Sequence, residues 1–573
     1  MKTNVKTMLR SPLVIIVGAI TIYFIVAFLL LPNLSLLVQI FFPNGSPSVR
    51  AFAALMSSQR AINSLRNSFI LAIVLSITVN VVGIFIVLVT RYFKIAGSRI
   101  LWIGYASALV YGGVVAVAGY KFVFGPMGLV TKLLQVFWPS MDKNWFTGAA
   151  AVIIVLTFTS TGQHMLFLSA ALAKIDYTTI EAAKMMGASA WKILWTIVLP
   201  TIKPMIYAIT ILTFLHGLTA FAAPQVLGGV SFQTISPMIL TFVQAPGSRD
   251  LAAALAIVLG LSTLILLTVL NKMQSGGTYF SVSKVPATMR RQKIESKPAN
   301  VLVHVLSYVL FVIYVFPPIL ISVFSFTNAR AIATGTLTWD SFTIDNYVRV
   351  FTQKSAYKPL LVSIGYSAIT SIVVIVLVLF IARIVQRYVN LVTVAVEYLL
   401  HIPWVLPTAL LALGLILTFS NRQWIVGDKV LTGTVIILGI AYVAEMMPFS
   451  LRLMKASFAA IPETMEEAAT NLGAGSFYTF RRVLLPLVLP TAAAVTALNF
   501  NSHLTEYNSA VFLAHPLFQP LGIVIQDATR GDSSLGDAVA LTFVYTVIIM
   551  ILSTVTMWLV YGRTSNNRAD TGR

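Results

Sequence analysis

The sequence predicts an all-α integral membrane protein in which twelve transmembrane helices form two parallel six-helix repeats. Hydrophobic residues make up 58% of the 573 residues and charged residues only 10%, which excludes an ordinary soluble domain. Long apolar runs, such as residues 69–90 and 363–382, suit spanning helices better than the short alternating strands of a barrel. In addition, Glu181-Ala-Ala-Lys-Met-Met-Gly187 returns 286 residues later as Glu467-Ala-Ala-Thr-Asn-Leu-Gly473, which indicates a tandem duplication.

Each apolar run of about twenty residues can cross the hydrocarbon core as a helix. The predicted spans of the first half are residues 12–36, 68–90, 99–121, 148–172, 201–223 and 251–271. Those of the second half are residues 301–325, 361–382, 391–418, 432–455, 489–514 and 538–562. The first run is long and lacks a small-residue cleavage site, so we interpret it as an uncleaved helix. Because six spans return the chain to its starting side, the two halves are expected to be parallel repeats.

The predicted domains are a first repeat at residues 1–272, a polar and basic linker at 273–300, and a second repeat at 301–573. The net charge of +21 gathers in loops that would share one side of the membrane, which favours membrane topology over nucleic-acid binding. By the positive-inside rule these loops and both termini face the cytoplasm, although three arginines oppose the trend. The basic residues on the expected cytoplasmic side include Lys2, Lys6, Arg10, Arg91, Lys94, Arg99, Lys174, Lys184, Lys192, Lys203, Arg290, Arg291, Arg481 and Arg482, and the opposing ones are Arg50, Arg60 and Arg66.

The repeated segment is expected to form a short helix, a tight turn and a second helix along the membrane surface. Thr178 or Thr179 can cap the first copy, and Pro462 can begin the second. Gly187 and Gly473 would end the helices in a left-handed turn, which glycine adopts without steric cost. A single Glu-Ala-Ala run could be ordinary helix sequence, but two copies in register favour a functional element.

This pattern resembles the EAA loop of permease subunits in binding-protein-dependent ABC importers. The copies span about residues 175–200 and 461–486, and residues 125–134, 218–229 and 504–507 are also similar to fused permeases of the ferric-iron, thiamine and 2-aminoethylphosphonate group. The resemblance implies the type I ABC importer permease fold in a bacterial cytoplasmic (inner) membrane. It also implies that coupling to the ATPase involves Glu181, Ala182, Ala183, Gly187, Glu467, Ala468, Ala469 and Gly473.

The implied partners are two copies of an ABC ATPase on the cytoplasmic side and an extracytoplasmic solute-binding protein. The sequence contains no GxxxxGK[ST] phosphate loop, catalytic triad or HExxH motif, so we expect a permease that is not itself an enzyme and holds no cofactor. ATP and Mg²⁺ would be bound by the partner ATPase. The absence of cysteine excludes disulfides and thiolate metal sites.

Polar residues gather in the eleventh predicted span, where ionisable groups are functional candidates. Asn499, Ser502, His503 and Glu506 recur at helical spacing, with Tyr507 adjacent, and could line a translocation path. They could bind a ferric ion weakly, but a satisfied helix contact or a water-filled gate is the favoured alternative.

The sequence therefore predicts the permease of an ATP-driven importer, with ferric iron as the first choice of cargo by resemblance. Thiamine and aminophosphonate remain alternatives, because selectivity would reside mainly in the binding protein. An ion-coupled secondary transporter would share the span count, but its expected acidic and arginine-rich loop is not matched by residues 91–99. An integral membrane enzyme would need a catalytic constellation that the sequence does not show.

Overall fold

The computed structural model describes residue 8 and residues 12–173, 175–274, 290–530 and 536–559, and their regular structure is helical. The helices of the first half are α2 (Pro12–Phe24), η1 (Ile25–Leu30), α3 (Leu31–Phe41), η2 (Pro43–Gly45), α4 (Arg50–Ser57), α5 (Gln59–Val87), η3 (Leu88–Tyr92), α6 (Ser98–Val110), α7 (Gly113–Phe124), α8 (Leu129–Phe137), α9 (Gly148–Thr159), η4 (His164–Leu168), α10 (Ser169–Leu172), α11 (Tyr177–Met185), α12 (Ala190–Ile193), η5 (Leu194–Val198), α13 (Leu199–Leu218), α14 (Ala222–Leu227), α15 (Ile235–Gln244) and α16 (Arg249–Gln274).

The helices of the second half are α17 (Lys297–Phe324), α18 (Ala329–Thr334), η6 (Trp339–Ser341), α19 (Asp345–Thr352), α20 (Lys354–Arg387), α21 (Leu391–Leu400), α22 (Ile402–Val405), α23 (Thr408–Phe419), η7 (Trp424–Val426), α24 (Val435–Ala459), α25 (Glu463–Asn471), α26 (Ser476–Thr479), η8 (Phe480–Leu484), α27 (Leu485–Leu504), α28 (Ala510–Leu513), α29 (Leu521–Arg530) and α30 (Gly536–Met557). Eleven segments of the described chain are long and apolar enough to cross a membrane, and one helix pair bent by 105° makes up to twelve. The predicted all-helical membrane fold is confirmed.

Several predicted spans have different boundaries in the structure; the fifth, for example, expected at 201–223, runs from Ala190 to Leu218. The third, expected at 99–121, breaks between α6 and α7, where Gly113 takes a left-handed φ of +60°, and the segment long enough to span is Gly113–Phe137. The ninth, expected at 391–418, bends before α23, where Pro407 lacks a backbone N–H and Leu406 is extended. The eleventh, expected at 489–514, begins earlier and ends with α27 at Leu504, so its last ten residues form a turn and the short helix α28.

The first helix of each half packs against the opposite half. The unit α2, η1 and α3 contacts α20, α21, α23 and α24, while α17 contacts α6 and α7. A side-chain hydrogen bond links the halves at each of these contacts. The Tyr23 hydroxyl donates to the Ile425 carbonyl at 2.9 Å, and the Tyr105 hydroxyl donates to the Ser307 carbonyl at 2.7 Å. The two sequence repeats are therefore intertwined rather than two side-by-side bundles.

The end of the predicted linker is bound to the first half. Residues 275–289 of the linker lie outside the described residues, but Gln292 pairs with the loop after η3. The Gln292 amide donates to the Tyr92 carbonyl at 2.7 Å, and the Lys94 amide donates to the Gln292 carbonyl at 2.8 Å. Ile294 is buried in the same core cluster as Tyr92. The end of the predicted polar and basic linker is therefore a packed strand-like segment.

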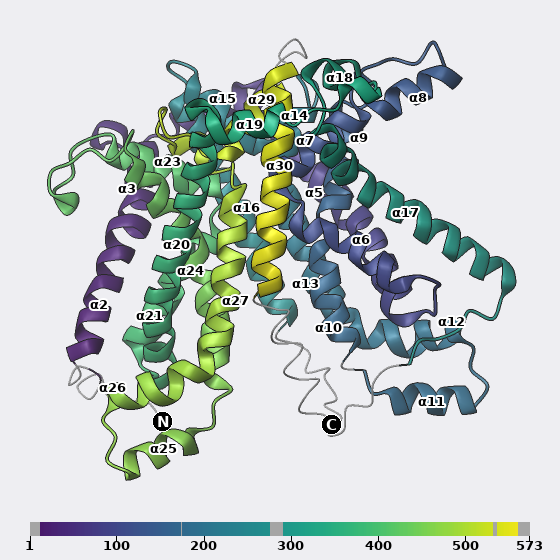
Figure 1. Ribbon diagram of the computed structural model, residues 1–573. Coiled ribbons are helices and arrows are strands. Elements are labelled where there is room, and N and C mark those ends of the chain that lie inside the picture. Colours follow the sequence, from purple (N-terminus) through teal and green to yellow (C-terminus); the bar gives the residue numbers. More distant parts are fainter. Residues whose placement is uncertain (1–7, 9–11, 174, 275–289, 531–535, 560–573) are drawn as a thin grey trace.

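The helices of the repeated EAA segments lie at one end of the molecule (Figure 1). Figure 1 shows α11 and α25 at the end of the molecule toward which the beginning of α2 points, while α14, α15 and α29 lie together at the opposite end. The long helices of the two sides converge toward α14 and α29 and diverge toward α11 and α25. The structure thus gives the two segments equivalent positions on the two sides of the molecule.

Candidate functional site

The two EAA segments, residues 175–200 and 461–486, begin with different helix caps. The Asp176 carboxylate accepts a hydrogen bond from the Thr178 amide at 3.0 Å, so Asp176 caps α11. The predicted cap at Thr178 or Thr179 is wrong, because those residues already lie inside the helix. The second helix, α25, follows Pro462 as predicted, and Glu463 and Glu466 in its first turn favour the positive end of the helix dipole.

Both helices end in the same glycine turn. Gly187 has φ +82° and Gly473 has φ +81°, so the predicted left-handed turn is confirmed in both copies. The Ala188 amide donates to the Ala183 carbonyl and the Ala474 amide donates to the Ala469 carbonyl, each at 3.0 Å. Together with the bonds of the glycine amides, this is a Schellman motif. The backbone of the two segments is therefore duplicated as faithfully as their sequence.

The corner of each segment exposes large apolar side chains. Met185 and Met186 are 89% and 81% exposed, and Leu472, 286 residues after Met186, is 88% exposed. Of the residues that the sequence assigned to coupling, those with exposed side chains or backbone are Glu181, Ala182, Gly187, Glu467, Ala468 and Gly473, while Ala469 is half-buried and Ala183 is buried. Each segment thus presents an acidic and apolar surface that the chain itself leaves uncovered.

The two segments are held to the spans by different forces. Ile180 and Ala183 of α11 are buried in a core cluster with Tyr92. By contrast, α25 has no buried residue, and Glu466, at the position equivalent to Ile180, forms an ion pair with Arg383 of α20. Helix α11 is therefore anchored by apolar packing and helix α25 by an ion pair, whereas further along the second segment Phe480 packs on Phe380, with ring centroids 5.3 Å apart.

A cavity of about 520 Å³ lies between the two halves. Its polar lining comes from both halves, and the described residues that line it include no lysine or arginine. The polar lining residues are Thr159, Ser160, Gln163, Thr213, His216, Thr219, Asn501, Ser502, Thr505, Glu506, Tyr507, Asn508 and Ser553. This cavity can hold a small polar solute on the interface of the repeats.

The structure separates the polar residues that the sequence grouped in the eleventh span. Ser502, Glu506 and Tyr507 line the cavity, but Asn499 and His503 are buried outside its lining against α24. The Asn499 side-chain amide donates to Ser450 Oγ at 2.9 Å. The His503 ring stacks on Tyr442 with centroids 4.3 Å apart. These two residues make helix contacts, as in the alternative prediction, but the contacts are only partly satisfied, because Asn499 Oδ1 and both ring nitrogens of His503 have no hydrogen-bond partner in the structure.

Glu506 lines the cavity and also binds the turn after α27. Its carboxylate accepts hydrogen bonds from the Ser509 amide at 3.0 Å, from Ser509 Oγ at 2.8 Å and from the Ala510 amide at 3.2 Å. These bonds hold the start of α28. Glu445 of α24 lies close enough for its charge to act on Glu506, and its Oε1 has no hydrogen-bond partner in the structure. Among the described residues, no three His, Asp or Glu side chains are placed to hold a metal ion.

Two aromatic side chains, one from each half, are in contact beside the cavity. Phe221, between α13 and α14, contacts Tyr507, between α27 and α28, with ring centroids 5.4 Å apart at 66°. The two residues are 286 positions apart, so they occupy equivalent places in the repeats. Both are buried, and Phe512 packs on Phe221 at 5.9 Å. Sequence reasoning missed Phe221, although the repeat offset from Tyr507 could have identified it.

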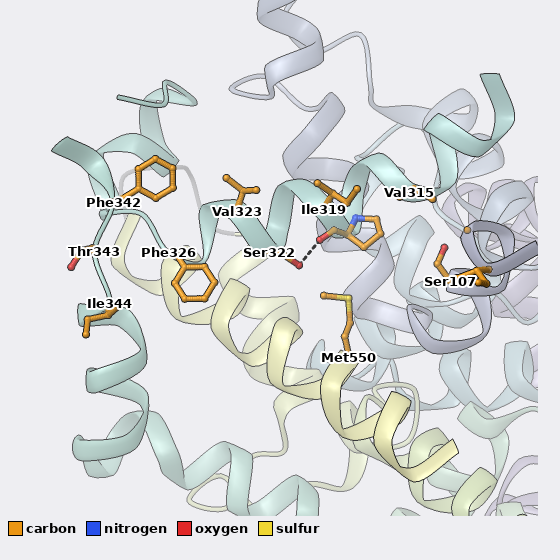
Figure 2. Close-up of a pocket in the computed structure, with 13 residues that line it drawn as sticks. Ser107, Val315, Ile319, Ser322, Val323, Phe326, Phe342, Thr343, Ile344 and Met550 are labelled. Atoms are coloured by element: carbon orange, nitrogen blue, oxygen red, sulfur yellow. Dashed lines mark hydrogen bonds between the residues drawn. The ribbon is translucent and has the colours of Figure 1, made fainter. Parts of the chain in front are cut away.

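A second cavity, of about 1100 Å³, opens between α6, α17 and α30 and is mainly apolar. Figure 2 shows Ser107, Ile319 and Met550 around it, one from each of these helices. The Ser322 hydroxyl donates to the Pro318 carbonyl of its own helix at 2.8 Å (Figure 2). This lining offers apolar contact rather than polar recognition, in contrast to the cavity between the halves.

Comparison with known proteins gives matches over most of the chain. The family described as binding-protein-dependent transport system inner membrane component matches twice, at residues 93–275 and 379–562. A protein of Sinorhizobium fredii that carries the name ABC transporter permease protein y4fN is 38% identical over 92% of both chains. The ferric transport system permease protein FbpB of Actinobacillus pleuropneumoniae is 24% identical over 95% of this chain and 78% of its own. A Salmonella typhi protein named for 2-aminoethylphosphonate transport, PhnV, is 25% identical over 43% of this chain and 90% of its own.

Proposed function

Because the chain belongs to the family of binding-protein-dependent transport system inner membrane components, it is an ABC transporter permease, and we propose that it forms the membrane path of an ATP-driven importer for ferric iron. In this proposal an extracytoplasmic binding protein delivers the cargo at the end that carries α14 and α29. Two ATPase subunits bind the opposite end, which faces the cytoplasm together with both termini. The residues of the termini, 1–7 and 560–573, lie outside the described residues.

The observation that carries the proposal is the pair of EAA segments. Both project from the same end of the molecule (Figure 1), both close with the same glycine turn, and both leave an apolar corner uncovered. A solvent-exposed apolar side chain beside acidic residues is suited to a protein partner. Since the two corners are equivalent by the repeat, we infer that each receives one ATPase subunit.

The packing of the segments provides a route by which a partner could move the spans. The helix α11 shares a core with η3 and the loop after it, and α25 is tied to α20 through Glu466 and Arg383. Closure of two ATP-bound subunits would draw α11 and α25 together and bring with them the diverging ends of the helices. The permease would alternate between two states in this way. The ATPase on one side and the loaded binding protein on the other would both shift the equilibrium between these states.

The charge of the cavity supports a cationic cargo. Glu506 is its acidic lining residue, Glu445 lies beside it, and the described lining residues include no lysine or arginine to balance them. An anionic phosphonate would meet uncompensated negative charge there, whereas a cation would be attracted. Between the two cations considered, ferric iron is favoured over thiamine because the relative named for ferric transport aligns with 95% of this chain.

The proposal is tested by reconstitution in vesicles with the ATPase and binding protein that co-purify with the chain. We expect ATP hydrolysis to rise when binding protein loaded with ferric ion is added outside, and iron to accumulate only when ATP is supplied. Thiamine and 2-aminoethylphosphonate serve as competing cargoes. Uptake by the chain alone without ATP would contradict the importer mechanism, and preferential uptake of a competitor would contradict the cargo assignment alone.

A further inference from the structure

Two arginines from distant parts of the sequence meet beside the first EAA segment. Arg91 lies at the end of η3, and Arg291 belongs to the linker segment that pairs with the loop after η3. Their guanidinium groups are close enough for their charges to repel each other. Arg291 donates to the Ser98 hydroxyl, and the Arg91 guanidinium lies over the Trp102 ring, 5.3 Å from its centroid. The backbone pairing at Gln292 therefore holds two like charges together.

The surroundings of the pair do not neutralise it. Residues 91–99 and 290–297 contain seven basic residues, Arg91, Lys94, Arg99, Arg290, Arg291, Lys293 and Lys297, and a single acidic one, Glu295. The ion pairs of the described chain join other residues, so neither arginine has a carboxylate partner. In the second half, by contrast, Arg383 is paired with Glu466. An arginine pair without an acid is a site suited to a phosphate group, which accepts hydrogen bonds from guanidinium donors.

The site lies where the spans leave the membrane. The apolar span of α5 and η3 ends at Tyr92, next to Arg91. On α6, Ile100 and Ile103 are 64% and 67% exposed, as expected for side chains that face lipid. Trp102, under Arg91, is an aromatic residue of the type that is enriched at membrane interfaces. A phosphate bound here would therefore sit at headgroup level.

The apolar cavity of Figure 2 begins within reach of this position. Ile103, Gly104 and Ser107 of α6 line it, and Ile103 is five residues beyond Ser98, or about 7.5 Å along the helix axis. One leaflet of the hydrocarbon core is about 15 Å thick, so an acyl chain that starts at headgroup level would extend into the cavity. The basic groups thus lie where the headgroup of a lipid would be, and the apolar groove lies where its acyl chain would be.

We propose that Arg91 and Arg291 bind the phosphodiester of an anionic phospholipid whose acyl chain occupies the groove between α6, α17 and α30. The site joins the two halves, because α17 follows directly from the linker segment that carries Arg291. It also adjoins the first EAA segment, since the Tyr92 hydroxyl donates to the Ala190 carbonyl at 3.0 Å and Phe93 packs on Trp191 at 5.4 Å. A bound lipid would therefore stabilise α12 of the first EAA segment and have no equivalent in the second.

The test is native mass spectrometry of the purified full chain, titrated with phosphatidylglycerol, phosphatidylcholine or inorganic phosphate. We expect a saturable site that prefers phosphatidylglycerol and that inorganic phosphate alone does not fill. The variant R91Q/R291Q should lose the preference, with an apparent affinity lowered about thirtyfold, the size expected for two basic groups at an anionic surface. The control R481Q/R482Q removes an exposed arginine pair from the second EAA segment and should bind as the wild type does.

Equal loss in the control, equal binding of the two lipids, or saturation by inorganic phosphate would each overturn the proposal. If R91Q/R291Q does not fold, the single variant R291Q is used, because its side chain lies on the surface of the linker segment. It should weaken phosphatidylglycerol binding about fivefold, the effect of one basic group. Unchanged binding by a folded R291Q chain would also overturn the proposal.

Discussion

Replacing Gly187 and Gly473 with valine should uncouple ATP hydrolysis from transport while the protein still folds. Both glycines have φ near +80°, and a Cβ added at either would meet no atom within 4 Å. The penalty is therefore backbone strain alone, about 1–2 kcal/mol at each position for an L-residue in the left-handed region. If the strain is relieved by opening the turn, the docking-competent shape of each segment becomes about 5 to 30 times less favourable.

The matched control is G475V in the same loop. Gly475 also has open space around its Cβ position, but its φ is outside the left-handed region, so valine adds bulk without that strain. The variants G187V, G473V and the double variant are compared with G475V for ATPase co-purification, cargo-stimulated hydrolysis and uptake in vesicles. Each single variant should weaken ATPase association, and the double variant should lose most uptake.

The reasoning is refuted if a well-inserted double variant imports cargo as fast as the wild type, or if G475V is as defective as G473V. The first result would mean that the turn shape does not transmit the ATPase movement. The second would mean that bulk at the corner, and not the left-handed backbone, is what the partner detects.

Three further changes test the anchoring, the path and the closure. R383Q breaks the ion pair between Arg383 and Glu466, so amide hydrogen exchange should rise in α25 but not in α11. The charge swap R383E/E466R should restore the protection of α25. Equal exchange in both helices would contradict separate anchoring. E506Q keeps an oxygen acceptor for the Ser509 amide but removes the charge and the second oxygen, which accepts from Ser509 Oγ and the Ala510 amide. Thermal stability should therefore fall by about 1–3 kcal/mol. Iron uptake per folded chain should fall about tenfold, and unchanged uptake would exclude a role for the charge. F221A removes the ring that contacts Tyr507 and should allow solute leakage without ATP, measured as efflux from vesicles; a tight F221A chain would show that other residues form the barrier.

Sequence alone was sufficient where one strong physical requirement fixes the answer. Apolar length identifies the spans, and a glycine at the end of a repeated helix predicts the left-handed φ that Gly187 and Gly473 adopt. It was insufficient at the breaks: the bend at Pro407 has a local signal that the prediction did not use, whereas residues 505–509 after the early end of α27 contain neither glycine nor proline. Helical spacing also grouped Asn499 and His503 with Glu506, although spacing alone cannot tell which residues meet the cavity and which meet α24.

The crossing of the first helices was likewise beyond sequence reasoning. Nothing in the composition of α2 or α17 indicates which half each will contact, since both are apolar over most of their surface. The repeat offset nevertheless holds even here: Ile294 follows Met8 by 286 residues, and both are buried. Met8 accepts a weak hydrogen bond from Asn390, on the loop between α20 and α21, at 3.6 Å. Both repeats therefore bury the residue at this position, and in both the first long helix contacts the opposite half.

The duplication has preserved backbone shape and changed the chemistry on the axis between the halves, and electrostatics gives a reason. Phe221 and Tyr507 touch across that axis, so their neighbours Ala220 and Glu506 occupy equivalent positions close to one cavity. A carboxylate at position 220 would add a third like charge to Glu506 and Glu445 in one weakly solvated space, where each disfavours ionisation of the others. The acidic residues of the second half are enough to attract a cation, because a cavity on the axis is lined by both halves at once. The EAA segments face the opposite constraint: each lies on its own side and meets its own partner, so the glycine turn has to be present twice.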